Sequence, residues 1–152
     1  MSYTGGCQCG KVKYTFTSEP IHTALCYCTN CQRQTGSTNT ASLTVAQQSF
    51  TSTGAAPKVY SRKSDAGADV HNHFCGDCGT TCWLTGTLAD SVGMLNVRIG
   101  TLDDLTLNQK WAPKMEVYCR EKYAWLPKLE GTKAFDAMVT AEAIEPFKKG
   151  AQ

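Results

Sequence analysis

Alternation of apolar and polar positions predicts a mainly β domain. Val12, Tyr14 and Phe16 alternate with polar residues, which is the period-two pattern of a half-buried strand. Further short segments are rich in Thr, Val, Tyr and Trp and are separated by Gly, Pro, Asp and Asn. These segments are 41–45, 59–60, 70–74, 81–84, 94–99 and 115–119. We therefore expect a fold of short strands joined by tight turns.

Helical signals are sparse along the chain. Residues 103–105 are compatible with a single helical turn, and residues 132–139 and 141–149 have some helical composition. No repeat or long linker divides the sequence. We expect one domain over residues 1–130 and a partly helical C-terminal extension, 131–152, that packs on the domain or trails from it.

Composition argues against several classes of protein. The 152 residues carry 15 Lys and Arg against 13 Asp and Glu, a formal net charge of +2. The basic residues form no long cluster, which argues against nucleic-acid binding and a polybasic membrane anchor. Apolar runs are far shorter than the ~20 residues that span a bilayer, and the N-terminus has no signal-peptide pattern. We expect a cytoplasmic protein, and its β edges could support a homodimer.

Nine cysteines, an odd number, are the unusual feature of the composition. A disulfide scaffold favours an even count and an oxidising compartment, so we interpret the cysteines as metal ligands. Seven of them fall into three clusters: Cys7 and Cys9; Cys26, Cys28 and Cys31; Cys75 and Cys78. The other two, Cys82 and Cys119, lie in predicted strands and are interpreted as buried small hydrophobic residues.

Closely spaced cysteines are typical of zinc sites, because two sulfur atoms must reach one ion from the same tight turn. The two pairs could supply the four ligands of a closed structural site, and the middle cluster would then be a three-ligand site. A three-ligand site leaves a coordination position open, as in catalytic zinc sites. Spacing does not establish which clusters share an ion, and a histidine could instead complete closed structural sites. The candidates for that ligand are His22, His71 and His73.

The compound cysteine pattern resembles the glutathione-dependent formaldehyde-activating family, the S-(hydroxymethyl)glutathione synthases. The match runs in order over residues 5–130, in segments 6–14, 26–31 with Gly36, 74–79 and 99–104. The resemblance implies a single-domain zinc-binding β-tent fold. It implies a structural zinc on Cys7, Cys9, Cys75 and Cys78, and a second zinc on Cys26, Cys28 and Cys31. We expect the second zinc to be labile, because an open site gains less from coordination than a closed one. It also implies a carbon–sulfur lyase or synthase that joins glutathione to formaldehyde.

Three positions depart from the usual family pattern. Tyr27 and Glu116 stand where the family usually carries histidine, and Gln32 follows the third middle cysteine where arginine is usual, with Arg33 one residue later. These positions are expected to line the pocket. We therefore expect the departures to concern the thiol or aldehyde substrate more than the fold or the metal.

The expected chemistry assigns roles to several side chains. A zinc-bound thiol is deprotonated at neutral pH and could attack an aldehyde carbon. Arg33 is the first candidate to bind a glutathione carboxylate; Arg98, Arg120 and Lys122 are weaker candidates, and each also fits a solvated surface charge. Tyr27 could donate a hydrogen bond to an oxyanion, and Glu116 could act as a base, although core packing and a salt bridge are the alternatives. Two other functions are compatible with the sequence: a non-catalytic carrier of glutathione or another thiol, and a zinc-stabilised protein-binding module.

Overall fold

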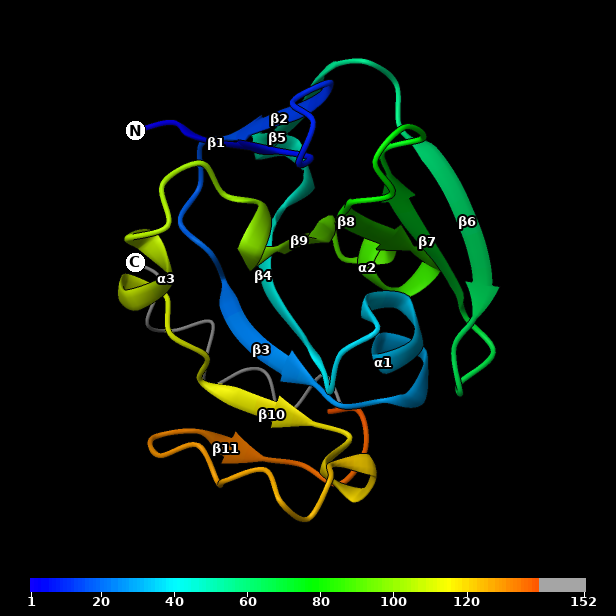
Figure 1. Ribbon diagram of the computed structural model, residues 1–152, viewed down its shortest axis with the longest axis vertical. Helices are drawn as coiled ribbons and strands as arrows, with labels where there is room; N and C mark the ends of the chain where they lie inside the picture. Colours follow the sequence, from blue (N-terminus) through cyan, green and yellow to red (C-terminus); the bar gives the residue numbers. More distant parts are fainter. Residues whose placement is uncertain (140–152) are drawn as a thin grey trace.

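Two β-sheets form the framework of the protein in a computed structural model, of which we describe residues 1–139 (Figure 1). The smaller sheet is antiparallel, in the order β1 (Tyr3–Gly6), β2 (Val12–Phe16) and β5 (Phe50–Gly54). The larger sheet has eight strands, in the order β11 (Lys133–Ala134), β10 (Met115–Val117), β3 (His22–Cys26), β4 (Thr40–Ala46), β9 (Met94–Arg98), β8 (Thr81–Gly86), β7 (Asp69–Phe74) and β6 (Lys58–Lys63). The mainly β architecture predicted from the sequence is confirmed.

Helices are short and lie between strands. They are α1 (Thr29–Thr35), α2 (Thr87–Ser91) and α3 (Leu107–Lys110), with 3-10 turns η1 (Gln47–Ser49), η2 (Ile99–Thr101) and η3 (Cys119–Glu121). The turn expected at residues 103–105 is not helical, and α3 begins at Leu107 instead. Within 132–139, where composition suggested helix, the chain forms β11. Pairing with β10 overrides the weak local preference. The other segment of helical composition, 141–149, lies outside the described residues.

The core lies between the smaller sheet and the central strands of the larger one. Tyr14 on β2 is fully buried, and its ring packs edge-on against Trp83 of β8 at a centroid distance of 6.0 Å. Phe50 also packs on Trp83, at 5.1 Å. The same cluster includes Cys7, Cys75 and Cys82, so the loops that carry two of the predicted ligands are fixed by core packing.

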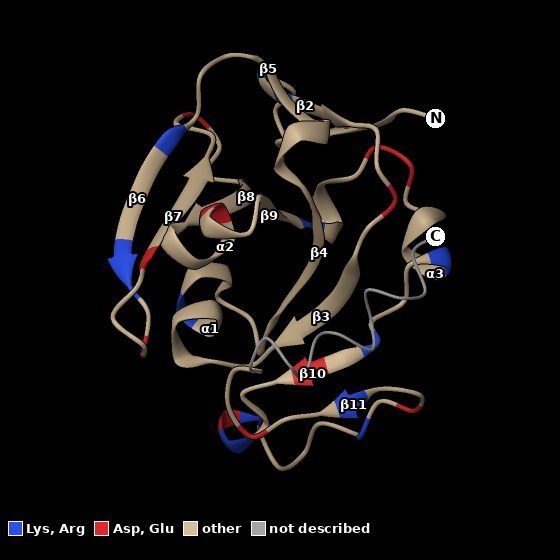
Figure 2. Ribbon diagram, turned by 180° about the vertical axis from the view of Figure 1, so that it is seen from behind, with Lys and Arg blue, Asp and Glu red and all other residues tan. Residues whose placement is uncertain are grey.

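The larger sheet is bounded by strands of different character. Strand β6 is an exposed edge, and Figure 2 shows basic positions at both of its ends. Strand β11 forms the other edge, and its neighbour β10 runs parallel to both β3 and β11, which places acidic Glu116 between them. Basic and acidic positions are interspersed on the molecule. Within residues 1–139, no helix combines the length and apolarity needed to cross a membrane.

Candidate metal centres

Four cysteine sulfurs from two distant loops meet beside the smaller sheet. The Sγ atoms of Cys7, Cys9, Cys75 and Cys78 all lie within 4.8 Å of one another. Cys9 joins the two loops, because its Sγ lies 3.5 Å from that of Cys7 and 3.6 Å from that of Cys75. All four thiols are free of disulfide bonds. Four convergent thiols can hold a tetrahedral metal ion with no position left open.

The two loops that carry this cluster have the same construction. Each contains a glycine with positive φ, Gly10 at 76° and Gly79 at 75°, a conformation that other residues rarely adopt. The N–H of each glycine donates to the carbonyl of the first cysteine in its loop, Cys7 or Cys75. An ion pair between Lys11 and Asp77 links the loops at the surface. The tight turns therefore aim both cysteine pairs at the same point.

A second group of thiols lies where β3 passes into α1. The Sγ atoms of Cys26, Cys28 and Cys31 lie within 4.8 Å of one another. Cys28 is the N-cap of α1, and its sulfur accepts a hydrogen bond from the Cys31 N–H at 3.4 Å. Among residues 1–139, no histidine or carboxylate joins either group. Each group could hold a metal ion, and this one supplies three ligands.

The three histidines are engaged elsewhere. His22 pairs with the Thr44 hydroxyl at 2.8 Å, and His71 pairs with Ser61 at 2.7 Å. His73 contacts the Thr85 hydroxyl and stacks on Trp83. The alternative in which a histidine completes a cysteine site therefore finds no support among the described residues.

Charge is distributed unevenly within the three-cysteine cluster. Hydrogen bonds from the thiols of Cys26 and Cys28, aided by Thr40 and Arg98, lower the pKa of Cys31 to about 2. The same thiol contacts, with burial, raise the pKa of Cys26. Without a metal ion, the cluster therefore favours a single thiolate. A divalent cation would be needed to hold all three cysteines as thiolates.

Buried Glu116 links β10 to the three-cysteine loop. Its carboxylate is only 1% exposed and accepts hydrogen bonds from the Tyr27 hydroxyl, the Lys122 ammonium and the Thr132 hydroxyl, each at 2.7 Å. Glu116 is therefore salt-bridged, as one of its two alternatives expected. The Tyr27 hydroxyl already donates its hydrogen bond to this carboxylate. Glutamate and tyrosine together form a hydrogen-bonded support behind the cysteines.

Tyr118 is a residue near the three cysteines to which sequence analysis gave no role. Its φ is 58°, the one positive φ outside glycine among the described residues. Burial, Asp65 and the Cys28 and Cys26 sulfurs raise the pKa of Tyr118 to about 12, so the ring lies near the cluster. The sequence carries no local signal for this, because tyrosine ordinarily avoids the left-handed region.

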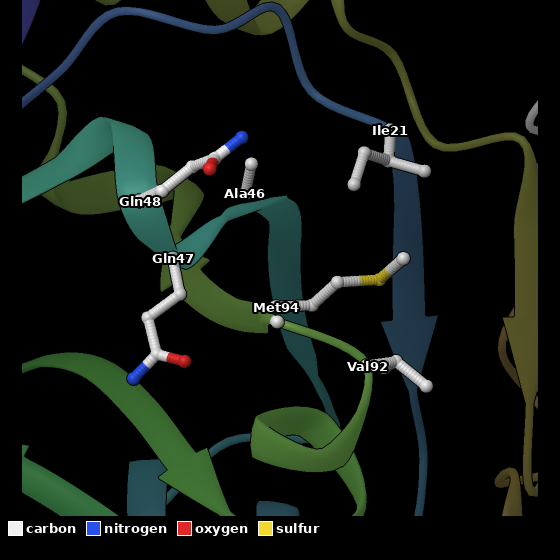
Figure 3. Close-up of a pocket in the computed structure, with 7 residues that line it drawn as sticks. Ile21, Ala46, Gln47, Gln48, Val92 and Met94 are labelled. Carbon is white, nitrogen blue, oxygen red and sulfur yellow. The ribbon is translucent and has the colours of Figure 1, made fainter.

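Two hollows differ in their relation to the cysteines. One, of about 480 Å³, is lined by the end of α1, the start of β4 and the loop after Cys78. The other, of about 590 Å³, is lined by Ile21, Ala46, Gln47, Gln48, Val92, Gly93 and Met94 (Figure 3). Only the first has lining residues next to both cysteine groups.

A comparison with models of known protein families identifies the family of this chain. The family model for the glutathione-dependent formaldehyde-activating enzyme matches residues 2–121. This chain belongs to that family. The match includes all seven clustered cysteines and Glu116, whereas Lys122 and Thr132, which bind the Glu116 carboxylate, lie beyond it.

Other comparisons give this family member a structural neighbour but no curated relative. A search of curated proteins found no significant match. A crystal structure of a Rhodobacter sphaeroides protein, determined as a structural genomics target, superposes with a TM-score of 0.50 and 17% sequence identity. The alignment covers 66% of this chain and 87% of the other, and it supports the fold alone.

Acid should lower the folding stability of this family member, partly by protonating Glu116. Burial alone would raise the pKa of Glu116, but hydrogen bonds from Lys122, Thr132 and Tyr27 outweigh it and lower the pKa to about 2. A depressed folded-state pKa stabilises the protein above the unfolded value of 4.5, and this contribution, about 3 kcal/mol, is lost as pH falls towards 2. Glu116→Gln should therefore be less stable than the parent at pH 7, and the difference in unfolding free energy should shrink between pH 5 and pH 3. A constant difference in denaturant titrations would contradict the assignment.

Proposed function

We propose that this protein is a zinc-dependent carbon–sulfur lyase or synthase that joins a thiol to an aldehyde, with glutathione and formaldehyde or a related aldehyde as substrates. The observation that carries the proposal is the three-thiol cluster of Cys26, Cys28 and Cys31, which stands apart from the four-thiol cluster. Membership of the family supports the substrate class. A purely structural module would need the four-thiol cluster alone.

The sulfur ligands of the two cysteine groups fit zinc. Thiolates are soft ligands that zinc prefers, and sulfur from two tight turns suits tetrahedral coordination. Cys7, Cys9, Cys75 and Cys78 would hold one ion as a closed structural site, and Cys26, Cys28 and Cys31 would hold a second. When bound at the second site, zinc would supply an open position at which a substrate thiol is kept deprotonated.

The reaction balances without an oxidant or a reductant. The thiolate sulfur forms a bond to the aldehyde carbon, and the carbonyl π electrons move to oxygen. That oxygen takes up a proton, giving a hemithioacetal, and the reverse reaction releases thiol and aldehyde. The chain's part is to bind and orient the thiol next to the aldehyde, which raises their effective concentration.

Side chains around the three cysteines have supporting roles in this proposal. Tyr27 and Glu116 would hold the cysteine loop in place through their 2.7 Å hydrogen bond. Arg33 is exposed in the last turn of α1, two residues beyond Cys31, and stays a predicted contact for a glutathione carboxylate. Glu116 is engaged by three donors, so a base role would require one of them to leave.

Zinc content tests the two-site proposal. Protein purified without chelator should contain two zinc ions per chain, one for each cysteine group. Prolonged dialysis against glutathione should reduce this towards one, because an open site binds less tightly than a closed one and glutathione competes for its ion. Zinc is measured by plasma mass spectrometry. A content that stays at one, or that glutathione never changes, would favour closed structural zinc and a binding module.

Turnover separates an enzyme from a thiol carrier. Glutathione and formaldehyde react spontaneously, so the exchange rate between free and adducted glutathione should be measured by NMR with and without protein. An enzyme should raise this rate in proportion to its concentration. A carrier should bind glutathione and leave the rate unchanged.

A further inference from the structure

Arg98 is a buried cation with neutral partners. It ends β9, is 8% exposed, and pairs in register with Ser42 of β4. Its Nη1 donates to the Ser42 hydroxyl at 2.7 Å and its Nη2 to the Gln34 side-chain oxygen at 2.6 Å. A guanidinium carries further N–H donors, and the Nε–H has no hydrogen-bond partner among residues 1–139.

Two other cations that the sequence offered as carboxylate contacts, Lys122 and Arg120, are already paired with carboxylates of the chain. Lys122 contacts Glu116 at 2.7 Å, and Arg120 contacts Asp65 at 3.5 Å. Within the described chain, Arg98 forms no such ion pair, although its burial makes an uncompensated charge costly. The nearby Cys31 sulfur offers partial compensation, since its charge and that of Arg98 influence each other.

Arg98 borders the 480 Å³ hollow described above. Arg98 lines it together with Thr40, whose buried hydroxyl is close to the Cys31 thiol. The remaining lining is neutral: Gln34, Thr35, Ser37, Asn39, Ala41, Gly79, Thr80, Thr81, Ile99 and Gly100. A hollow whose lining has one cation and no acid has the chemistry of an anion site.

The hollow is next to the proposed open metal site. Thr40 pairs directly with Cys26 across strands β3 and β4, and Gln34 lies one helical turn from Cys31 on α1. Thr80, which also lines the hollow, contacts the Cys78 sulfur at 3.3 Å. A thiol bound in the hollow would therefore lie close both to the metal site that binds its sulfur and to the arginine that binds its carboxylate.

We propose that Arg98, assisted by Thr40, binds a carboxylate of the thiol substrate in this hollow. The inference rests on the proposed function and narrows its substrate to thiols that carry a carboxylate. It gives this role to a buried arginine, whereas the sequence favoured the exposed Arg33. Arg98 would be a specificity-determining residue, because a charge-assisted, forked contact discriminates carboxylated thiols from neutral ones.

Binding to the zinc-loaded protein tests the proposal by calorimetry with three probes. The probes are glutathione, the same tripeptide with alanine in place of cysteine, and 2-mercaptoethanol. Arg98→Gln should weaken binding of both tripeptides by at least about 10-fold and leave 2-mercaptoethanol unchanged, because one charge-assisted contact is lost. Thr40→Val should weaken both tripeptides by a smaller factor. Arg62→Gln, on the edge strand β6 and outside the lining of the hollow, is the matched control and should change nothing.

Several results would overturn the proposal. It fails if glutathione and 2-mercaptoethanol lose affinity equally in Arg98→Gln, or if the alanine tripeptide binds this variant as it binds the parent. It also fails if Arg98→Gln, with its fold intact by circular dichroism, loses one zinc ion, because Arg98 would then serve the thiolates rather than the substrate. If Arg98→Gln does not fold, Arg98→Lys and Thr40→Val carry the test. Loss of the tripeptide preference in both would support the proposal, and its retention in both would overturn it.

Failure of the proposed function gives a different result. If the alanine tripeptide binds in an Arg98-dependent way but no thiol adds affinity and no turnover occurs, the carboxylate site stands and the thiol chemistry does not. If thiols bind and react regardless of Arg98, the chemistry stands and the carboxylate site does not.

Discussion

Cys78→Ser is expected to prevent the protein from folding stably. Cys78 belongs to the four-thiol group, which joins the loop after β1 to the loop after β7. Within this group, Cys9 and Cys75 are in contact although they lie 66 positions apart in the sequence. A structural zinc contributes about 10–16 kcal/mol in small zinc domains, which is comparable to or larger than the whole stability of a typical domain, about 5–15 kcal/mol. Loss of one ligand should therefore remove the cooperative thermal transition seen by circular dichroism. Cys7→Ser should behave in the same way.

Cys119→Ser is the matched control for Cys78→Ser. Cys119 is half-buried at the start of η3 and belongs to neither cysteine group. The same chemical change at this position should lower the melting temperature by only a few degrees. If Cys78→Ser melts like Cys119→Ser, the four-cysteine metal assignment is wrong.

Cys28→Ser is expected to leave a folded protein that lacks the second zinc and the lyase or synthase activity proposed above. Cys28 is the N-cap of α1, and serine is a preferred N-cap residue whose hydroxyl can replace the sulfur as acceptor for the Cys31 N–H. The substitution therefore keeps the helix start while removing one of three metal ligands. Activity should fall by more than about 100-fold, since even outer-shell changes cost 10–100-fold.

Metal content and stability, measured on the same sample, test the Cys28 prediction. Zinc should drop by one ion per chain while the far-ultraviolet circular dichroism spectrum stays that of the parent. Loss of all zinc would mean that the two groups are not independent. Unchanged zinc and activity would show that Cys28 is not a ligand.

Local sequence pattern was sufficient for much of the sheet but not for all of it. Strands β2, β4 and β6–β10 lie where alternation or β-rich composition predicted them, although β10 ends at Val117 and Cys119, predicted to lie in a strand, begins the 3-10 turn η3. Strands β3 and β5 were not predicted. Strand β1 contains Gly5 and Gly6, which are poor strand formers, and β11 has only two residues. These strands exist because neighbours pair with them: β2 holds β1, and β10 holds β11. Such pairing is a long-range effect that a local window does not contain.

The sequence by itself determined what depends on spacing along the chain. Two or three cysteines a few residues apart can converge only in a tight turn, so the three clusters and the family are readable from the printed residues. Only the tertiary structure decided what depends on distant neighbours. Glu116 meets Tyr27 across 89 positions, and Arg98 meets Gln34 across 64. Burial and charge state arise from such contacts. They decide that Glu116, for which the sequence left both a base and a salt bridge open, is a buried ion-pair partner, and that Arg98, for which a solvated surface charge was one alternative, lies in the interior.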